Sequence, residues 1–341
     1  MAKKKTVKKT KVKAKNKKKK KGGNSLAVLV IAVVIIALVV VVSKLKGGPA
    51  VKYIKAEKLA EWGEQGEKKG QLNSPRGIAV SPDNEYVYVS VLNSSALYKF
   101  KQDGTFVSGS AGKGAKPGEF NEPSGISVDR DGNVYVADAW NGRIQKFDSK
   151  GVFKLEIGGV KGGFYSPRNV SVSKYGVVYV ADTGTSRIHR FDAAGTRMGN
   201  PVGGAGKSLG KFGEVFGIAF DSKGKVYAAD AGNRRIQVFS SDLTPQQQVS
   251  VKSWNNNFPL WPMLAVDSKD RLYAVSSGTQ EIVVFDTTGK KIKQIGIIKN
   301  DMRDKPLFAN PLGIAIDSQD FLYVTEITRN KVLKIKPQFE Q

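Results

Sequence analysis

Aspartate and arginine recur five residues apart at three places in this chain: Asp138/Arg143, Asp182/Arg187 and Asp230/Arg235. One interpretation is a ring of charge that binds a ligand. The other is a structural ion pair that braces one loop in each copy of a repeat. The structural interpretation is favoured because a pair present in several copies does not mark a single active site, and a partly buried pair mainly enforces geometry. We therefore predict no catalytic role for these six residues.

Few other residues in the chain could carry chemistry. The absence of cysteine excludes disulfides and thiolate chemistry, and His189 is the only histidine, predicted to be an ordinary strand residue. The segment Asp129–Asn133 (DRDGN) is similar to the start of a calcium loop but lacks the spacing and terminal glutamate of an EF-hand. A hairpin turn explains its composition. We predict no metal site and no cofactor.

A further set of residues lies in loops where the copies of the repeat differ. Tyrosine, tryptophan and arginine are enriched at interface hot spots, and a difference between copies is not explained by packing of the repeat. The alternative is a set of ordinary loop residues on a solvated rim. The predicted ligand-binding face consists of Arg76, Trp140, Asn141, Tyr165, Arg168, Phe216, Arg234, Trp261 and Arg329.

These residues must be positioned by a repeat of 44 to 50 residues that occurs six times between residues 73 and 336. In the second copy, residues 125–129, 134–138, 143–148 and 152–157 are short β-prone segments separated by turn residues. Four strands at this period are typical of a propeller blade. Each copy has a tyrosine in its second strand: Tyr88, Tyr135, Tyr179, Tyr227, Tyr273 and Tyr323.

The sixth copy ends after its third strand, at Val332–Lys336. Upstream of the first copy, Lys58–Gly63 (KLAEWG) matches the missing fourth strand. We predict that this segment completes blade six and closes the ring, which removes exposed sheet edges. The predicted fold is all-β: a six-bladed β-propeller with four antiparallel strands per blade, preceded by one N-terminal transmembrane helix.

The repeats resemble the NHL-repeat family over about residues 57–336. The resemblance rests on the P-x-G opening at Pro75–Gly77, Pro123–Gly125 and Pro311–Gly313, on the Y-V-A-D segment, and on the D-x-x-x-x-R-I sequence after it. It implies a propeller of unspecified function, since members bind RNA, proteins or small ligands and some are enzymes.

Enzymes with this fold place histidines around zinc, depend on histidine, or use Glu, Asn and Asp around a divalent metal at the channel mouth. This chain has one histidine. The position before the blade-opening glycine holds no acid: Arg76, Ser124, Arg168, Phe216, Pro262 and Leu312. The resemblance therefore implies binding more than catalysis.

The N-terminal region indicates a membrane anchor. Ser25–Ser43 has 19 residues without a charge, and as a helix it spans roughly 28 Å. Thirteen lysines precede it, so most of the net charge of +25 lies in the tail. The positive-inside rule predicts a cytoplasmic N-terminus and extracytoplasmic repeats. The alternative is a cleaved signal peptide ending at Val41–Ser43. The predicted segments are tail 1–24, transmembrane helix 25–43, linker 44–56 and propeller 57–341.

These observations predict a single-pass protein of the cell membrane whose propeller binds a protein, a peptide or a cell-envelope polymer without catalysis. The lysine tail is expected to lie near anionic lipid. One alternative is a propeller-type metal-dependent hydrolase or lyase. A second is nucleic-acid binding by a basic propeller face, which the predicted topology disfavours because the repeats face away from cytoplasmic RNA.

Overall fold

A computed structural model describes residues 54–159, 163–254, 261–286, 288–298 and 305–339. The predicted tail (1–24), the predicted transmembrane helix (25–43) and all but the last three residues of the predicted linker (44–56) lie outside these ranges. Within the described ranges, no helix has both the length and the apolar character needed to cross a membrane.

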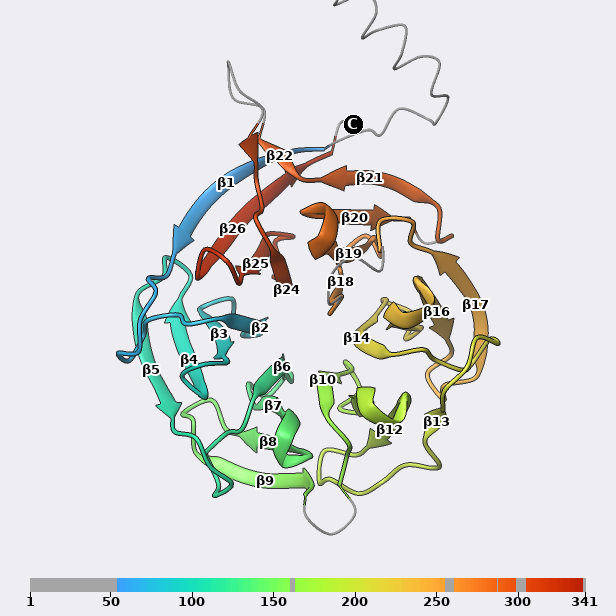
Figure 1. Ribbon diagram of the computed structural model, residues 1–341, viewed down its shortest axis with the longest axis horizontal. Coiled ribbons are helices and arrows are strands. Elements are labelled where there is room, and N and C mark those ends of the chain that lie inside the picture. Colours follow the sequence, from blue (N-terminus) through green and yellow to red (C-terminus); the bar gives the residue numbers. More distant parts are fainter. Residues whose placement is uncertain (1–53, 160–162, 255–260, 287, 299–304, 340–341) are drawn as a thin grey trace, which may run out of the picture. The chain divides into compact units, whose positions relative to one another are not determined.

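Six four-stranded antiparallel sheets are arranged as the blades of a ring, which confirms the predicted six-bladed β-propeller (Figure 1). Blade one contains β2 (Pro75–Val80), β3 (Tyr86–Val91), β4 (Ala96–Lys101) and β5 (Phe106–Ala111). Blade two contains β6 (Pro123–Val128), β7 (Val134–Asp138), β8 (Arg143–Phe147) and β9 (Phe153–Gly158). Blade three contains β10 (Pro167–Val172), β11 (Val178–Asp182), β12 (Arg187–Phe191) and β13 (Val202–Gly203).

The second half of the ring repeats this order. Blade four contains β14 (Val215–Phe220), β15 (Val226–Asp230), β16 (Arg235–Phe239) and β17 (Pro245–Ser250). Blade five contains β18 (Leu264–Val266), β19 (Leu272–Ser276), β20 (Glu281–Phe285) and β21 (Lys291–Ile295). Blade six contains β24 (Pro311–Ile316), β25 (Leu322–Glu326), β26 (Lys331–Gln338) and β1 (Lys55–Trp62). A small two-stranded antiparallel sheet, which was not predicted from the sequence, pairs β22 (Ile297–Ile298) with β23 (Lys305–Pro306).

The core lies between adjacent blades, where the flat faces of the sheets pack on each other. All five residues of β7 are buried, because a second strand has a neighbouring blade on both faces. The outer strand β17, of sequence PQQQVS, is almost wholly exposed, and its polar composition suits contact with water. The repeated tyrosines belong to the layers between blades: Tyr135 packs with Val180 and Phe191 of blade three. Burying such rings is the main stabilising contribution of each interface.

Aspartate-capped turns join the first and second strands of most blades. In blade two, Asp129 Oδ1 accepts hydrogen bonds from the backbone N–H groups of Asp131 (3.0 Å) and Asn133 (2.8 Å). The Tyr135 hydroxyl donates to Asp129 Oδ2 at 3.2 Å. The carboxylate is thus used within the turn, as expected of an Asx turn. The predicted hairpin turn at Asp129–Asn133 is confirmed.

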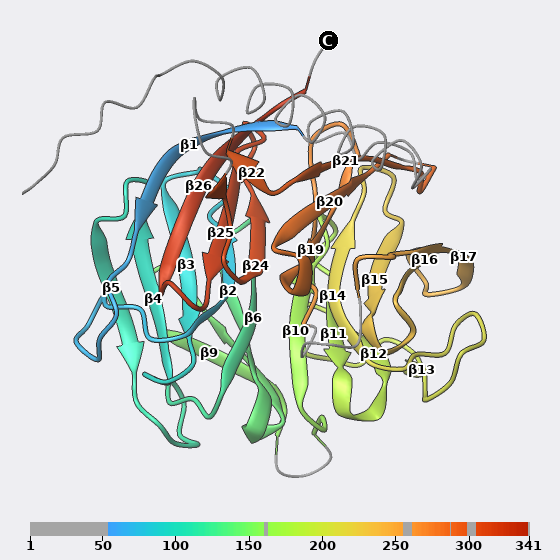
Figure 2. The ribbon, with the colours of Figure 1, turned by 45° about the horizontal axis from the view of Figure 1, so that its top comes forward.

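The ring is closed by the N-terminal strand, as predicted. Strand β1 pairs antiparallel with β26, with Lys58 opposite Ile335 and Trp62 opposite Val332. Figure 2 shows the two strands, blue and red, side by side at the closing blade. β1 begins at Lys55, two residues before the predicted domain boundary at 57. Residues from both ends of the propeller therefore share one sheet.

The blade-opening glycines let the innermost strands approach each other closely. A Cβ atom added to Gly77 would lie 2.2 Å from the carbonyl oxygen of Ser124 in the next blade. One added to Gly313 would lie 2.2 Å from the carbonyl oxygen of Arg76. Because only glycine lacks a Cβ, this close approach requires the glycine of the P-x-G pattern in blades one and six. The residues just before these glycines are consequently held at the centre of the ring.

Candidate ligand-binding site at the centre of the loop face

Most residues of the predicted binding face line one open pocket of about 900 Å³. Its size is within the range of small-molecule sites, about 300–1,000 Å³. It lies over the loops that enter blades three and four and the loops between the second and third strands of blades two and three. The predicted binding residues that line it are Trp140, Asn141, Tyr165, Arg168, Phe216 and Trp261.

Two exposed aromatic rings stand at this pocket. The side chains of Trp140 and Tyr165 are 70% and 72% exposed, the largest values among the exposed large hydrophobic residues described. Trp140 belongs to the short 3₁₀ turn Ala139–Asn141 after β7, and Tyr165 precedes β10. Neither ring is needed for the core, so both are available to a ligand. Phe216, in contrast, is 3% exposed and forms part of the wall.

Beside this pocket, charged residues from three blades meet a tryptophan from a fourth. Glu122 Oε1 accepts hydrogen bonds from Arg76 Nη1 at 2.7 Å and from Arg168 Nη1 at 2.5 Å. The Arg76 guanidinium also lies over the Trp261 ring, 4.3 Å from its centroid, and that of Arg168 lies 5.7 Å from it. Two cations thus share one anion against an aromatic face. We call Arg76, Glu122, Arg168 and Trp261 the central cluster.

Arg76 is the most deeply buried member, at 5% exposure. Burial lowers the pKa of Arg76 below its ordinary value and outweighs Glu122, which raises it. The nearby Arg168 charge lowers it further. Its Nε group is buried and has no hydrogen-bond partner among the described residues. A buried cation compensated by only part of one carboxylate is costly. The central cluster therefore carries an excess positive charge at the edge of an open pocket.

Glu122 is the member of the central cluster that sequence reasoning missed. It stands directly before the P-x-G opening, where blades one and three have Ser74 and Ser166. All three adopt a left-handed backbone, with φ of 65°, 64° and 62° in chain order. This conformation is uncommon for a residue with a long side chain. The residue type at this position does not single out Glu122, because blade four has Glu214 there.

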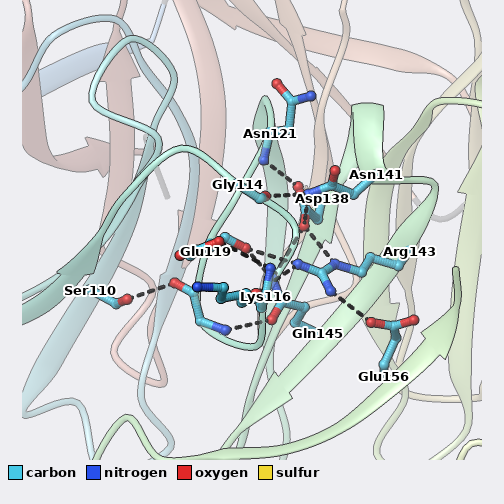
Figure 3. A network of polar contacts seen from close by, with 11 residues as sticks. Ser110, Gly114, Lys116, Glu119, Asn121, Asp138, Asn141, Arg143, Gln145 and Glu156 are labelled. Atoms are coloured by element: carbon cyan, nitrogen blue, oxygen red, sulfur yellow. Dashed lines mark hydrogen bonds and ion pairs between the residues drawn. The ribbon is translucent and has the colours of Figure 1, made fainter.

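The Asp138/Arg143 pair belongs to a different network that holds the loop entering blade two (Figure 3). Arg143 Nε lies 2.8 Å from Asp138 Oδ2, and Arg143 Nη1 lies 2.7 Å from Glu156 Oε2. Arg143 Nη2 donates to the carbonyl oxygens of Lys116 and Glu119. Both ends of the pair are buried and saturated with protein partners. The pair therefore organises a loop and does not face a ligand.

Blade four repeats this network. Arg235 Nε lies 2.7 Å from Asp230 Oδ2, and Arg235 Nη2 donates to the carbonyl oxygens of Ser208 and Lys211. Asn141 and Asn233 also take equivalent roles, each donating its amide to the aspartate and to a loop carbonyl. The amide nitrogen of Asn141, a predicted binding residue, is therefore already bonded to protein groups.

The predicted pair Asp182/Arg187 in blade three is not formed. Arg187 is exposed, while Asp182 Oδ2 accepts a hydrogen bond from Thr185 Oγ1 at 2.5 Å and lies 3.6 Å from His189 Nε2. The Asp182 carboxylate is thus engaged by groups of its own blade, and the loop entering blade three is also shorter in sequence. The arginines of blades two and four are held by carbonyls of nine-residue loops, 112–120 and 204–212, whereas the equivalent segment 159–164 has six residues.

Two predicted binding residues lie apart from the others. Arg234 lines a separate polar pocket with Lys207, Asn233 and Arg235. Arg329 donates to the carbonyl oxygen of Leu307 in the blade-six region and lines none of the described pockets. The structure thus divides the predicted face into one central group and two outlying arginines.

His189 is 8% exposed and lies among protein groups. Arg197 Nη1 is 2.7 Å from its Nδ1 atom, and the Phe164 ring packs edge-on with its centroid 5.1 Å away. It does not line the pocket of the central cluster. Among the described residues, no group of three or more His, Cys, Asp or Glu side chains is placed to hold a metal ion.

A second pocket, of about 540 Å³, is lined by hairpin turns of blades three to five. Its residues include the exposed Tyr175 and the buried Tyr179. Blade three has Ser173 where blades two, four, five and six have the turn aspartate, and the Tyr179 hydroxyl donates to the carbonyl oxygen of Ser241. None of the predicted binding residues lies there.

Comparison with known sequences identifies part of the repeat. The NHL repeat model matches residues 120–147, which span the start of β6 to the end of β8. No curated protein sequence matches the chain.

Solved structures with the same fold include enzymes and a binding complex. A catalytically inactive histidine-to-alanine variant of virginiamycin B lyase from Staphylococcus aureus, with quinupristin, has 13% identity and a TM-score of 0.55 over 84% of this chain and 100% of that chain. A gluconolactonase from Xanthomonas campestris has 16% identity and a TM-score of 0.59, covering 85% and 98%. A chain of a nidogen/laminin complex has 18% identity and a TM-score of 0.51, covering 65% and 79%. At these identities the similarity shows the fold alone.

Proposed function

We propose that this chain is a non-catalytic binding propeller that holds a protein, a peptide or a cell-envelope polymer in the pocket of its loop face. The observation that carries the proposal is the combination of two unused exposed aromatic rings, Trp140 and Tyr165, with Arg168 in one pocket of about 900 Å³. Aromatic and arginine anchors around a desolvated pocket are the usual source of binding energy. The closed ring supplies a rigid scaffold that holds them in place.

The test is capture of partners from an envelope extract by the wild-type protein and by two variants, Trp140→Ala and Arg168→Ala. We expect each variant to reduce capture by about tenfold or more, as for loss of a hot spot. Because Trp140 is largely exposed, its removal should leave the melting temperature unchanged.

The matched control is Tyr175→Ala, which removes another exposed aromatic ring, 69% exposed, from the turn pocket. Capture by this variant should equal that of the wild type. If Trp140→Ala and Arg168→Ala capture as much partner as the control does, the binding site is elsewhere on the molecule.

The second candidate function is that of a metal-dependent hydrolase or lyase. The fold similarity to a lyase and a gluconolactonase favours it, and Glu122 supplies one carboxylate at the pocket. The single histidine is an argument against a lyase like that of S. aureus, since His189 is buried away from this pocket. Turnover of lactones or depsipeptides with added divalent cations, lost in Glu122→Gln, would establish the enzymatic alternative.

We further propose that the protein is anchored in the cell membrane by residues 25–43, with the propeller outside the cytoplasm. Support comes from the uncharged segment Ser25–Ser43 and the thirteen lysines before it. The test is proteolysis of intact cells: the propeller should be digested when protease has access to the extracytoplasmic side, and the lysine tail only after lysis. Protection of the propeller in that experiment would reverse the topology and exclude an envelope ligand.

A further inference from the structure

The charge of the central cluster points to a particular chemical class of ligand. The buried Arg76 and the half-buried Arg168, with side chains 6% and 17% exposed, share a single Glu122 carboxylate oxygen. The group therefore carries one positive charge more than its internal partners neutralise. The other charged residue that lines the pocket besides Arg168 is Glu214, which is exposed.

The excess charge lies where a ligand can reach it. Arg168 lines the open pocket, whereas Arg76 is held behind it between Glu122 and the Trp261 ring. Only 17% of the Arg168 side chain is exposed, so an arriving anion meets a guanidinium whose competing hydration is already reduced. Charge-assisted hydrogen bonds to arginine are then short, and about twice as strong as neutral ones.

The exposed rings specify the rest of the ligand. Trp140 and Tyr165 line the same pocket as Arg168, with neither ring used in the core. A ligand that fills this pocket presents a planar or apolar body to these rings while its charged end reaches Arg168. Aromatic side chains at a pocket with one polar anchor are the arrangement expected for such a ligand.

Resting on the binding function proposed above, we infer that the pocket recognises an anionic ligand, a carboxylate or phosphate joined to a planar or apolar ring, with Arg168 as the anion contact. Arg76 adds positive charge next to Arg168 without contacting the ligand. Glu122 competes with the ligand anion for both guanidiniums. The acidic ring can be a free small molecule or a terminal unit of an acidic polymer.

The experiment is calorimetric titration of the full-length protein with 2-naphthoate and with 2-naphthamide, its neutral isostere. We expect the acid to bind about tenfold more tightly than the amide. Arg168→Gln should abolish this preference, and Arg168→Lys should restore part of it. The matched control is Arg187→Gln, which removes the same charge from an exposed position in the same blade and should leave the preference intact.

Glu122→Gln separates a binding role from a structural one. If Glu122 competes with the ligand, its removal strengthens acid binding several-fold even if the melting temperature falls. If the central cluster only braces the ring, the variant loses stability and gains no affinity for the acid, and the inference is wrong.

Two further results would overturn the inference. Equal binding of acid and amide would overturn the anion inference while leaving the loop face as a binding site. Binding of neither probe would overturn it too, and the capture experiment with Trp140→Ala would then report on the binding function independently. Titration with galacturonate and its trimer distinguishes the sources: tighter binding of the trimer indicates a polymer, and equal binding indicates a small molecule.

Discussion

Arg143 and Arg187 occupy equivalent positions in blades two and three, opposite Asp138 and Asp182 in the same strand register. Of the two, Arg143 reaches its aspartate, and its guanidinium is also held by the carbonyl oxygens of Lys116 and Glu119, whereas Asp182 is engaged by Thr185. A side chain's role is therefore set by the number of partners that surround it, and a repeated residue type does not guarantee a repeated contact.

This contrast gives a prediction at the residue scale. Arg143→Ala leaves the buried Asp138 carboxylate without its guanidinium and should cost about 3–5 kcal/mol of unfolding free energy. The matched change Arg187→Ala removes an exposed side chain and should stay within about 0.5 kcal/mol of the wild type. Guanidinium denaturation of both variants checks this. Equal losses would mean that the Asp138/Arg143 pair contributes nothing specific.

At the scale of elements, β1 decides whether the ring is closed. It joins residues from the beginning of the propeller to β26 at its end, and Trp62 packs edge-on against Tyr323 with centroids 6.4 Å apart. Without β1, the edge of β26 would be open to pairing with other chains. Closure thus depends on the packing of one strand.

The strand itself supplies matched variants for a test. Trp62→Ala removes a side chain that is 8% exposed and should cost about 3–5 kcal/mol, the usual range for a buried tryptophan. Leu59→Ala changes a residue of the same strand that is 41% exposed and should cost well under about 1 kcal/mol. Light scattering during thermal unfolding should show earlier aggregation for Trp62→Ala alone. Similar behaviour of the two variants would show that β1 is not essential to closure.

The whole molecule buries carboxyl groups that its ion pairs do not neutralise. In blade five, Ser276 and Glu281 replace the Asp–Arg pair, and in blade six Glu326 accepts hydrogen bonds from the N–H groups of Ala309 and Asn310. Burial raises the pKa of both Glu281 and Glu326 above the ordinary value of 4.5. The folded state consequently binds protons at these sites more tightly than the unfolded chain does.

The sign of the resulting pH dependence follows from linkage. As pH rises from 4.5 through the raised pKa values, the unfolded chain loses protons first, so the stability of the fold decreases across this window. Glu326→Gln should reduce this decrease, because the amide oxygen can still accept the two backbone hydrogen bonds and carries no charge. Unfolding midpoints measured from pH 4 to pH 8 check the prediction. Parallel curves for the wild type and the variant would contradict it.

Much of the fold was predictable because its signals are local. The alternation of apolar residues, the turn aspartates and the match between Lys58–Gly63 and a fourth strand are all properties of short segments. The small sheet of β22 and β23 was not predicted, since it has no counterpart in the other copies. The anchor predicted at 25–43 lies outside the described residues and stays a prediction.

The site was predictable only in part. Differences between copies singled out Trp140, Tyr165, Arg168 and Trp261, which the structure places in one pocket. These differences did not separate the pocket residues from Arg234 and Arg329, which lie elsewhere. Knowing that a residue belongs to a loop does not tell which neighbouring blade its side chain points toward. Glu122 was missed because its significance depends on two arginines, each 46 residues away.

The blades, their turns and the likeness of Lys58–Gly63 to a fourth strand could be read from the order of residues, because each is a pattern within one repeat period. Which Asp–Arg pairs form, and the meeting of Arg76, Glu122, Arg168 and Trp261, follow only from the folded ring. Those four residues come from blades one, two, three and five. Their contact requires that the innermost strands converge at the centre of the ring. That convergence is a property of the closed ring, and no single repeat contains it.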